Sequence, residues 1–234
     1  MGIFKFKQFS VCDDRASMKV GTDAVLLGAW VDILLAKNIL DIGAGSGIIA
    51  LMIAQRTGPN VKINAVELLA QDAQQASENI SNSPWLGKIS VSNTSIQEFY
   101  PGRHYDRIIC NPPYFSKSLL PPIDTRIKVR HDTALTLDEL LAATGRLLSP
   151  MGKLSLILPF AESKAFIRKA NSTGLFLHHL TKFFTRHGKA QERTLMEFGF
   201  TAAPLREDSL ILYQSKSHWT KEYRKLTQDF YLDQ

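Results

Sequence analysis

The chain has 234 residues and a mass of 26.2 kDa, and 44% of its residues are hydrophobic, which suffices for one well-buried α/β domain. It has no apolar run of the roughly 18 residues that a membrane span needs, and its two cysteines, Cys12 and Cys110, indicate neither a disulfide framework nor a metal site. The formal net charge is +6, and residues 151–234 hold 13 basic and 8 acidic side chains, a bias that is compatible with a phosphate-bearing partner.

The N-terminal part of the chain predicts a lid followed by a helix. In residues 4–20, three phenylalanines alternate with polar side chains before an acidic turn, which indicates an irregular or hairpin-like lid. The apolar stretch 24–35 predicts a buried helix, with Thr22 or Asp23 as its N-terminal cap.

A nucleotide-binding pattern comes next. A β run, a glycine turn and a helical pattern follow one another, at Asn38–Ile42, Gly43-Ala44-Gly45-Ser46-Gly47 and Ile48–Arg56. Glycines keep such a turn tight and let a ligand approach the backbone, and the helix start offers free N–H groups. A second strand, predicted at residues 62–66, ends in Glu67, which lies 20 residues after Gly47, the offset at which an acidic group meets ribose hydroxyls. The alternative is a glycine turn that serves packing only.

The next predicted elements lead to a second distinctive stretch. A helix is expected at residues 69–81, a break at Pro84-Trp85, a third strand at 89–91 and a short helical turn that ends at Phe99.

The strand predicted at Tyr105–Cys110 must end at Asn111, because Pro112 and Pro113 remove two backbone donors. In open α/β sheets, ligands bind at the carboxyl ends of parallel strands. The amide oxygen of Asn111 and the carbonyl of Pro112 are both acceptors, so together they suit a planar amine with two N–H bonds, and Tyr114 offers a ring to stack on. The alternative is a proline-terminated strand whose tyrosine caps the sheet edge.

The second half of the chain predicts more elements and a change of topology. Residues 116–130 read as a long exposed loop, either a functional lid or a disordered segment. Thr136 to Glu139 form a capping box that begins a helix. The further expected elements are a helix at 140–148, a strand at 153–158, a helix at 162–173, strands at 176–184, 194–201 and 209–213, and a helical tail at 219–231 that docks on the body. We expect 176–184 and 194–201 to pair antiparallel at the sheet edge, with 209–213 as one further edge strand.

The glycine turn with Asp41, the acid Glu67 and the Asn-Pro-Pro-Tyr stretch resemble class I S-adenosylmethionine-dependent methyltransferases that methylate amino groups. Three further stretches resemble the bacterial valine-tRNA adenine-N(6) methyltransferase family, over essentially the whole chain: residues 19–30, the break at 82–85 and the ending at 222–231. The resemblance implies a Rossmann-like α/β fold with a seven-stranded, mostly parallel sheet whose last strand is antiparallel. It also implies one methyltransferase domain, 1–234, with a lid and helix in 1–38 and a catalytic core in 39–234.

The resemblance further implies S-adenosylmethionine as the cofactor. The residues expected to bind it are Thr22, Asp41, Gly43, Gly45, Gly47, Glu67, Ser95, Ile96 and Asn111. Of these, Glu67 would hold the ribose hydroxyls. Ser95 departs from the family pattern, because many relatives have an aspartate there to bind the adenine amine of the cofactor; a serine can still form one hydrogen bond, and Ile96 can pack on the adenine ring.

The expected reaction is methylation of the exocyclic amine of adenosine 37 in valine tRNA. Asn111, Pro112, Pro113 and Tyr114 are the predicted catalytic residues. Alignment of the amine with the methyl group would carry most of the catalysis, and no strong general base is required. The expected partner is the tRNA anticodon loop, and we expect a cytoplasmic monomer with no metal and no membrane contact.

The residues expected to contact the tRNA are basic: Lys19, Arg130, Lys182, Arg186, Lys189 and Arg193, with Lys5 and Lys7 in addition. A solvated, purely structural role for the basic side chains around the last hairpin is the alternative. His178 and His179 alternate along a strand and are not expected to bind metal.

Several other activities remain open at this point. A ribosomal RNA or DNA adenine methyltransferase would use the same chemistry. A protein glutamine methyltransferase is also compatible with Asn-Pro-Pro-Tyr, but that family carries a helical domain before the glycine motif, where this chain has only 38 residues before Ile39. A nicotinamide-dependent oxidoreductase would share the glycine turn and Glu67 but gives no reason for Asn-Pro-Pro-Tyr, and a binding module with a degenerate site is the remaining alternative.

Overall fold

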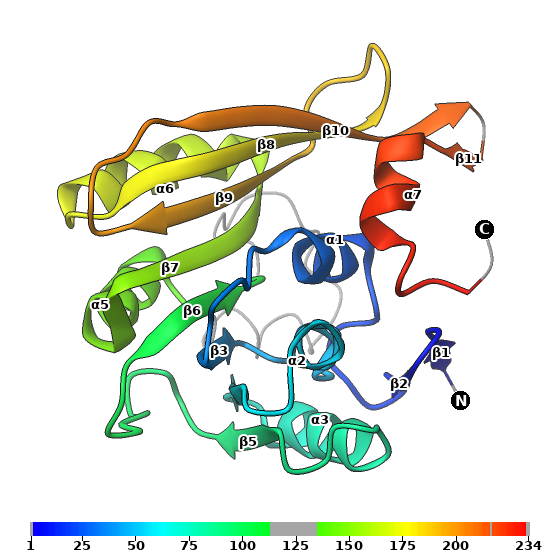
Figure 1. Ribbon diagram of the computed structural model, residues 1–234, viewed down its shortest axis with the longest axis vertical. Helices are drawn as coiled ribbons and strands as arrows, with labels where there is room; N and C mark the ends of the chain where they lie inside the picture. The colour runs from blue at the N-terminus through cyan, green and yellow to red at the C-terminus, as the bar shows by residue number, and fades with distance from the viewer. Residues whose placement is uncertain (1, 113–134, 216, 233–234) are drawn as a thin grey trace, which may run out of the picture.

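The structure is a computed structural model that describes residues 2–112, 135–215 and 217–232. Within these ranges the chain folds around one large twisted sheet, with a separate hairpin near the N-terminus (Figure 1). The strands are β1 (Ile3–Lys5), β2 (Ser10–Cys12), β3 (Asn38–Ile42), β4 (Lys62–Glu67), β5 (Ile89–Asn93), β6 (Tyr105–Cys110), β7 (Leu148–Pro159), β8 (Phe176–Arg186), β9 (Arg193–Gly199), β10 (Arg206–Ser215) and β11 (His218–Trp219). The helices are α1 (Thr22–Trp30), α2 (Ile48–Arg56), α3 (Ala70–Ser81), α5 (Leu137–Leu147), α6 (Phe160–Ser172) and α7 (Lys221–Thr227).

The large sheet has nine strands among the described residues, in the order β11-β10-β8-β9-β7-β6-β3-β4-β5. Strands β5, β4, β3, β6 and β7 are parallel neighbours, and β9 is antiparallel to both β7 and β8. The predicted Rossmann-like fold is therefore confirmed. The seven expected strands are β5, β4, β3, β6, β7, β9 and β8 in their order across the sheet, and β9, the last of them in the sequence, is the antiparallel one. Two additional strands, β10 and β11, extend the sheet beyond the expected number.

The predicted hairpin of β8 and β9 is antiparallel, but its placement at the sheet edge is wrong. Strand β9 inserts between β7 and β8, and β10 then pairs with β8 in parallel. Six consecutive residues of β9, from Thr194 to Gly199, are buried, so the strand needs a neighbour on each side and packing on both faces. The outer position goes to β10, which confirms the further edge strand expected at 209–213, and to the short β11; the residues of both are more exposed.

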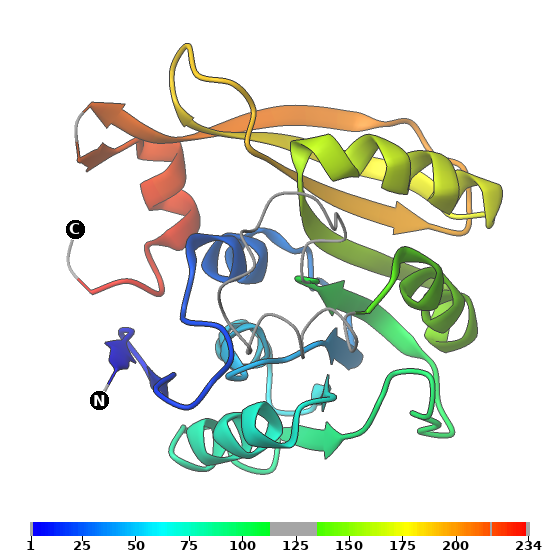
Figure 2. The ribbon, with the colours of Figure 1, turned by 180° about the vertical axis from the view of Figure 1, so that it is seen from behind.

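Helices cover both faces of the sheet, as Figures 1 and 2 show from opposite sides. On one face, α1, α2 and α7 enclose a core that includes Leu26, Met52 and Tyr223. On the other face, α5 and α6 pack through Leu140 and Phe166 against the alternate residues of the same strands. The strands thus have both faces buried, which explains their continuous apolar runs.

Most predicted elements lie within one to three residues of their expected bounds, but one cap prediction is wrong. The capping box of Thr136 and Glu139 is present at the start of α5. Helix α1 begins at Thr22 with Gly21 as its N-cap, and no side chain caps it. Asp23 instead pairs with Arg193, so the expected capping role of Thr22 or Asp23 is contradicted. The loop predicted at 116–130 lies outside the described residues.

The two ends of the chain lie side by side. The hairpin of β1 and β2 contacts the C-terminal tail through a β-bridge between Phe6 and Tyr231, and the backbone N–H of Lys7 donates to the carbonyl of Phe230 at 2.8 Å. Phe230 is 2% exposed and Tyr223 1% exposed. The prediction that the tail docks on the body is therefore confirmed, and the expected lid is a hairpin at its start. No helix among the described residues is long and apolar enough to cross a membrane.

Candidate active site

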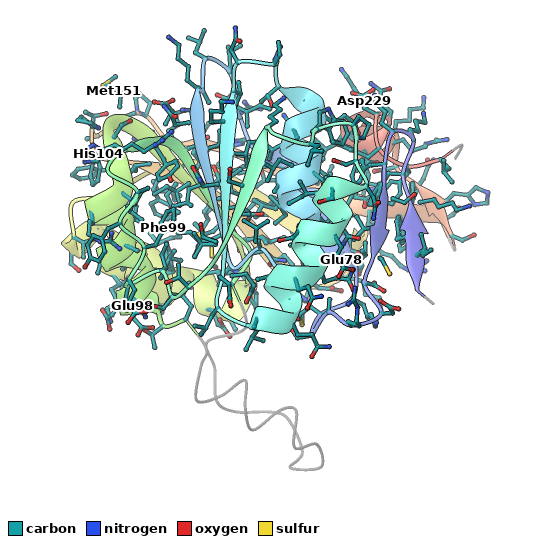
Figure 3. All side chains as sticks on the ribbon, turned by 90° about the horizontal axis from the view of Figure 1, so that it is seen from below. Glu78, Glu98, Phe99, His104, Met151 and Asp229 are labelled. Atoms are coloured by element: carbon teal, nitrogen blue, oxygen red, sulfur yellow. The ribbon has the colours of Figure 1, made fainter. Side chains whose placement is uncertain are left out.

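The predicted site residues end three neighbouring strands of the sheet. Ile42 of β3 is in register with Val66 of β4 and with Cys110 of β6. The next residue of each strand therefore brings Gly43, Glu67 and Asn111 into one row at the carboxyl edge. Figure 3 shows the strands from the side, with Glu98 near this edge and His104 near the opposite one. Parallel strand pairing thus gathers residues that lie 68 positions apart in the sequence into one site.

The glycine turn of residues 43–47, called here the glycine loop, has the backbone that its sequence requires. Gly43, Gly45 and Gly47 have φ angles of 72°, 55° and 81°, in the left-handed region that glycine adopts without strain. A Cβ on Gly43 or Gly45 would meet no atom within 4 Å, whereas one on Gly47 would lie 3.2 Å from the Cβ of Ala76 in α3. The first part of the loop is therefore open to a ligand, and its last glycine packs against a helix.

Glu67 is placed by backbone donors from both sides. Its two carboxylate oxygens accept hydrogen bonds from the N–H of Gly45 at 2.8 Å and of Leu69 at 2.9 Å. Burial raises the pKa of Glu67, while these two N–H groups oppose the shift. The side chain of Asn93, at the end of β5, donates to the carbonyl of Glu67 at 3.0 Å and holds the exit of β4. Each carboxylate oxygen of Glu67 keeps a lone pair for further donors.

Asp41 is the most perturbed carboxylate of the site. It is 1% exposed, and its Oδ2 accepts from the N–H of Ala50 in α2 at 3.1 Å. Its Oδ1 is buried and has no hydrogen-bond partner among the described residues. Burial raises the pKa of Asp41 to about 7, and the nearby Glu67 carboxylate adds to the shift. A cationic group near Oδ1 would restore the charged form.

The residues predicted to hold the adenine end lie after β5. The hydroxyl of Ser95 accepts from the N–H of Glu98 at 3.2 Å and so supports the following turn. Ile96 is 5% exposed and packs in the core beneath α5. The carbonyl of Ile96 is fixed by the guanidinium of Arg146 at 2.7 Å. Thr22, at the start of α1, is exposed. The expected cofactor contacts of these residues stay predictions.

Asn111 and Pro112 leave β6 beside the glycine loop. Asn111 is half-buried and Pro112 is buried. Among the hydrogen bonds between described residues, none uses the carboxamide of Asn111. Of the predicted catalytic residues, Pro113 and Tyr114 lie outside the described residues, and so does Arg130 of the predicted tRNA contacts.

The remaining predicted tRNA contacts differ in exposure. Arg186 and Lys189 are exposed in the turn between β8 and β9, and the guanidinium of Arg186 lies 5.2 Å from the centre of the Tyr213 ring. Because β8 is parallel to β7, this turn projects from the carboxyl edge of the sheet. Lys182 forms an ion pair with Glu207, and Arg193 with Asp23 at 2.7 Å.

Three more of these basic residues lie in the N-terminal part of the chain. The ammonium group of Lys19 contacts the carbonyl of Asp13, and that of Lys7 the carbonyl of Gln228. Lys5 is an exposed residue of β1. The carbonyl contact leaves the charge of Lys7 in place, whereas Lys19 also pairs with the carboxylate of Asp13 at 3.5 Å. Phosphate contacts of all three stay predictions.

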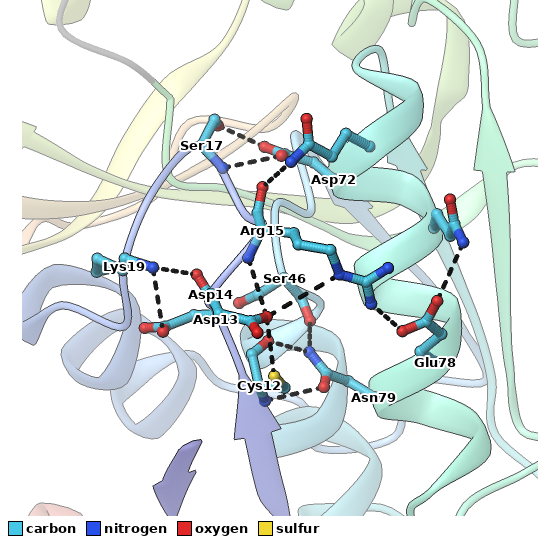
Figure 4. A network of polar contacts seen from close by, with 12 residues as sticks. Cys12, Asp13, Asp14, Arg15, Ser17, Lys19, Ser46, Asp72, Glu78 and Asn79 are labelled. Atoms are coloured by element: carbon cyan, nitrogen blue, oxygen red, sulfur yellow. Dashed lines mark hydrogen bonds and ion pairs between the residues drawn. The ribbon is translucent and has the colours of Figure 1, made fainter. Parts of the chain in front are cut away.

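Sequence reasoning missed a set of polar contacts between α3, the glycine loop and residues 12–20 (Figure 4). The carboxamide of Asn79 bonds the backbone of Cys12 and the carbonyl of Ser46, and the carboxylate of Asp72 bonds Ser17. The spacing in the sequence carried a signal. Asp72, Ala76 and Asn79 lie on one face of the helix, and this buried face carries two polar side chains, which need partners.

The site fits S-adenosylmethionine in its chemistry. That molecule carries an ammonium and a sulfonium group beside a nucleoside. Asp41 provides a buried carboxylate oxygen without a partner, the glycine loop leaves open space at Gly43 and Gly45, and Glu67 offers acceptors for ribose hydroxyls. Among the described residues there is no cluster of three His, Cys, Asp or Glu side chains that could hold a metal ion, and both cysteines are free thiols.

The sequence matches a known family model and curated proteins. Residues 16–169 match the model of the methyltransferase small domain. A protein of Phocaeicola vulgatus named tRNA1(Val) (adenine(37)-N6)-methyltransferase is 43% identical over 230 residues, which cover 98% of this chain and 97% of that protein. Proteins with the same name from Tolumonas auensis and Haemophilus influenzae are 42% and 41% identical, over 98% and 99% of this chain and 96% and 99% of theirs.

Solved structures agree with the fold. A structure described as a predicted O-methyltransferase from Agrobacterium tumefaciens has a TM-score of 0.67 and 21% identity, and the match covers 89% of this chain and 96% of that one. The glycopeptide N-methyltransferase MtfA, solved in complex with S-adenosylmethionine, has a TM-score of 0.52 and 12% identity, over 72% of this chain and 89% of that one. At these identities the likeness shows a shared methyltransferase fold.

Proposed function

The chain belongs to the tRNA1(Val) (adenine(37)-N6)-methyltransferase family, and we propose that it transfers the methyl group of S-adenosylmethionine to the exocyclic amine of adenosine 37 in valine tRNA. We also propose that it acts as a monomer in the cytoplasm and contacts the anticodon loop of its substrate. The full-length similarity to proteins of this name supports the choice of nucleic acid over a protein glutamine substrate.

One observation carries the chemical part of the proposal. The register of β4, β3 and β6 places Glu67, the glycine loop and Asn111 side by side at the carboxyl edge of the sheet. The first two suit a nucleoside cofactor, and the third suits an amine. A methyl donor and its acceptor must lie in line within a few ångströms, and adjacent strand ends meet that requirement.

Asn111 and Pro112 are proposed to hold the acceptor amine. An adenine amine is a weak nucleophile because its lone pair is delocalised into the ring. If the amide oxygen of Asn111 and the carbonyl of Pro112 each accept a hydrogen bond from one N–H of the amine, they favour a tetrahedral geometry at the nitrogen. Its lone pair then points toward the methyl group. The amine can lose its extra proton to water after the transfer, so no strong base is needed in the site.

The adenine must leave the stack of the anticodon loop to reach this edge, and an aromatic side chain can compensate for the lost stacking by roughly 1–3 kcal/mol. The sequence assigns that role to Tyr114. The exposed turn with Arg186 and Lys189 is proposed to contact phosphates of the same RNA, because it projects from the edge that carries Asn111.

On the cofactor side, S-adenosylmethionine supplies a methyl group activated by a sulfonium. Asp41 and the glycine loop would hold its methionine end, Glu67 its ribose hydroxyls, and Ser95 and Ile96 its adenine. Because the Oδ1 of Asp41 is buried without a partner among the described residues, a nearby ammonium group would stabilise the charged carboxylate. This interaction would contribute to the free energy of cofactor binding.

The proposal is tested with the purified protein, S-adenosylmethionine labelled on its methyl group and separate pools of tRNA, ribosomal RNA, DNA and release factor. We expect label in tRNA, at N6 of adenosine 37 of valine tRNA after nuclease digestion. Label in ribosomal RNA or DNA would mean that the protein methylates a different nucleic acid by the same chemistry. Label in release factor, or in none of the four pools, would overturn the proposal.

A further inference from the structure

One face of α3 contacts both the glycine loop and the segment of residues 12–20, which connects β2 to α1. Asp72, Ala76 and Asn79 lie on this face, since positions i, i+4 and i+7 of a helix point the same way. Asp72 is 3% exposed, Asn79 is 4% exposed and Ala76 is fully buried. Ala76 packs against Gly47, and the two polar side chains reach past it to the backbone of the other two segments.

Asn79 uses its whole carboxamide to join them. Its Oδ1 accepts from the N–H of Cys12 at 2.9 Å, and its Nδ2 donates to the carbonyl of Cys12 at 2.8 Å and to the carbonyl of Ser46 at 2.9 Å. Figure 4 shows the side chain between the two segments. Because these groups are buried or half-buried, loss of the carboxamide leaves one backbone N–H and two backbone carbonyls without this partner.

The carbonyl of Ser46 belongs to the last peptide unit of the glycine loop. The N–H of the same peptide unit, on Gly47, donates to the carbonyl of Ala44 at 2.8 Å. On the other side of the loop, the N–H of Gly45 is held by Glu67. Glycine residues flank Ser46 and impose little conformational restriction of their own, so these hydrogen bonds decide the direction of each peptide unit.

The segment of residues 12–20 is held in the same way. Asp72 accepts from the N–H of Ser17 at 2.9 Å and from its hydroxyl. Within the segment, Asp13 accepts from the N–H of Val20 at 2.9 Å and contacts the ammonium group of Lys19. Arg15 adds two contacts with α3: its guanidinium pairs with Glu78, and its carbonyl accepts from the side chain of Gln71 at 2.6 Å. The segment is thus closed on itself and attached to α3 at several points, of which only Asn79 also holds the glycine loop.

From these contacts we infer that Asn79 is a positioning residue that couples the two segments: it holds the glycine loop in its binding conformation and makes cofactor binding and the order of residues 12–20 depend on each other. The inference rests on the proposed function, since the ligand concerned is S-adenosylmethionine. Asn79 touches neither the cofactor nor the substrate amine in this role. It acts through the carbonyl of Ser46 and the backbone of Cys12.

The test compares the full-length protein with Asn79→Leu, which removes the carboxamide at similar size, and with Ser81→Ala as a control on the exposed side of α3. Calorimetry gives the affinity for S-adenosylmethionine, and hydrogen exchange gives the protection of residues 12–20 with and without it. For the control and the unsubstituted protein we expect equal affinity and slower exchange in the segment when the cofactor is bound. For Asn79→Leu we expect affinity reduced at least about tenfold, no cofactor-induced protection, and a KM for the cofactor that rises while kcat at saturation changes less than about threefold.

Asp72→Ala provides a milder second variant, because it releases Ser17 and leaves Asn79 intact. It should weaken cofactor affinity by a few fold with partial loss of the induced protection, and it serves alone if Asn79→Leu does not fold. Unchanged affinity in a folded variant whose segment exchanges faster would overturn the inference, since the two segments would then be independent. An unsubstituted protein that binds no S-adenosylmethionine would refute the proposed function itself, and the inference with it.

Discussion

At the scale of single residues, the polar groups of the site divide into those that have hydrogen-bond partners within the protein and those that have none among the described residues. Glu67 and Asn79 have backbone partners that orient them. Asp41 keeps a buried oxygen without a partner. A buried acceptor without a donor costs free energy, and proteins keep such groups where a ligand supplies the donor. This contrast separates residues that shape the site from those that bind.

We predict that Asn111→Ala lowers turnover at least about a hundredfold while the affinity for S-adenosylmethionine stays within about threefold. The reason is that the amide oxygen acts on the acceptor amine, so its loss removes an interaction made in the transition state. Single-turnover methylation of tRNA measures the first quantity and calorimetry the second. Loss of both together would place Asn111 among the cofactor contacts alone, and undiminished turnover would remove it from the site.

A second prediction concerns Asp41 and the stability of the protein without cofactor. Its pKa of about 7 in the folded state exceeds the ordinary 3.8, so the folded state keeps a proton that the unfolded state has lost, and stability decreases as the pH rises from about 4 through 7. Asp41→Asn lacks this titration. The free energy of unfolding of the variant minus that of the unsubstituted protein should therefore increase, by on the order of 2 kcal/mol, between pH 5 and pH 8.

Urea unfolding at a series of pH values measures this difference. A difference that stays constant over the range would mean that Asp41 is ionised in the folded protein. Added S-adenosylmethionine should reduce the pH dependence of the unsubstituted protein, because a neighbouring cation favours the carboxylate.

At the scale of elements, the site depends on how α3 packs on the glycine loop. The helix meets the loop at Ala76 and Gly47, where backbone and methyl group are in direct contact. The same helix face carries the polar contacts of Asp72 and Asn79. A larger side chain at this contact is therefore expected to strain the packing of the helix on the loop, whereas one on the open side of the loop meets no neighbour within 4 Å.

This contact predicts different effects for two glycine substitutions. Both Gly45→Ala and Gly47→Ala place a side chain at a positive φ, which costs about 1–2 kcal/mol. Only Gly47→Ala also brings a Cβ within 3.2 Å of Ala76. We expect Gly47→Ala to lower the melting temperature more than Gly45→Ala does, and a calorimetric melt of each variant compares them. Equal melting temperatures would show that α3 adapts without cost.

At the scale of the whole molecule, the sheet brings three functions to one edge. Parallel strands place Glu67, the glycine loop and Asn111, our proposed site residues, at this edge, and β8, by running parallel to β7, places Arg186 and the following turn with Lys189 there as well. The excess positive charge of the last third of the chain thus contributes exposed side chains on the substrate side. An RNA bound across this edge would meet its phosphates at the hairpin and its methyl donor at the glycine loop.

Salt dependence of tRNA binding tests this placement. Each phosphate contact releases counterions, so its loss should flatten the plot of log affinity against log salt by nearly one unit. We expect this flattening for Lys189→Ala. Lys62→Ala serves as the control, because Lys62 is exposed at the start of β4, at the opposite edge of the sheet. Equal slopes for all three proteins would mean that the hairpin turn does not touch the RNA backbone.

Features of the fold that depend on residues close together in the sequence could be predicted from the sequence. Strands β3 and β6 and helix α2 have their predicted bounds, because glycines and prolines set the turns that end them. The capping box of α5 was likewise readable from four consecutive residues. The candidate residues Glu67 and Asn111 could be named for the same reason, since each directly follows or ends an apolar run, whereas Asp41 was named from the family resemblance of the glycine turn.

The tertiary structure decided what depends on partners distant in the sequence. The sequence predicts Thr22 or Asp23 as a helix cap, but the carboxylate of Asp23 accepts a hydrogen bond from the guanidinium of Arg193, 170 positions away. Strand β9 was placed at an edge, but pairing with β7 and β8 buries it better. The role of Asn79 depends on Cys12 and Ser46, which lie 67 and 33 positions away in the sequence. The sequence by itself determined the chemistry at the strand ends, because local backbone preferences set it; the tertiary structure determined which of these groups meet, because strand pairing and core packing are long-range.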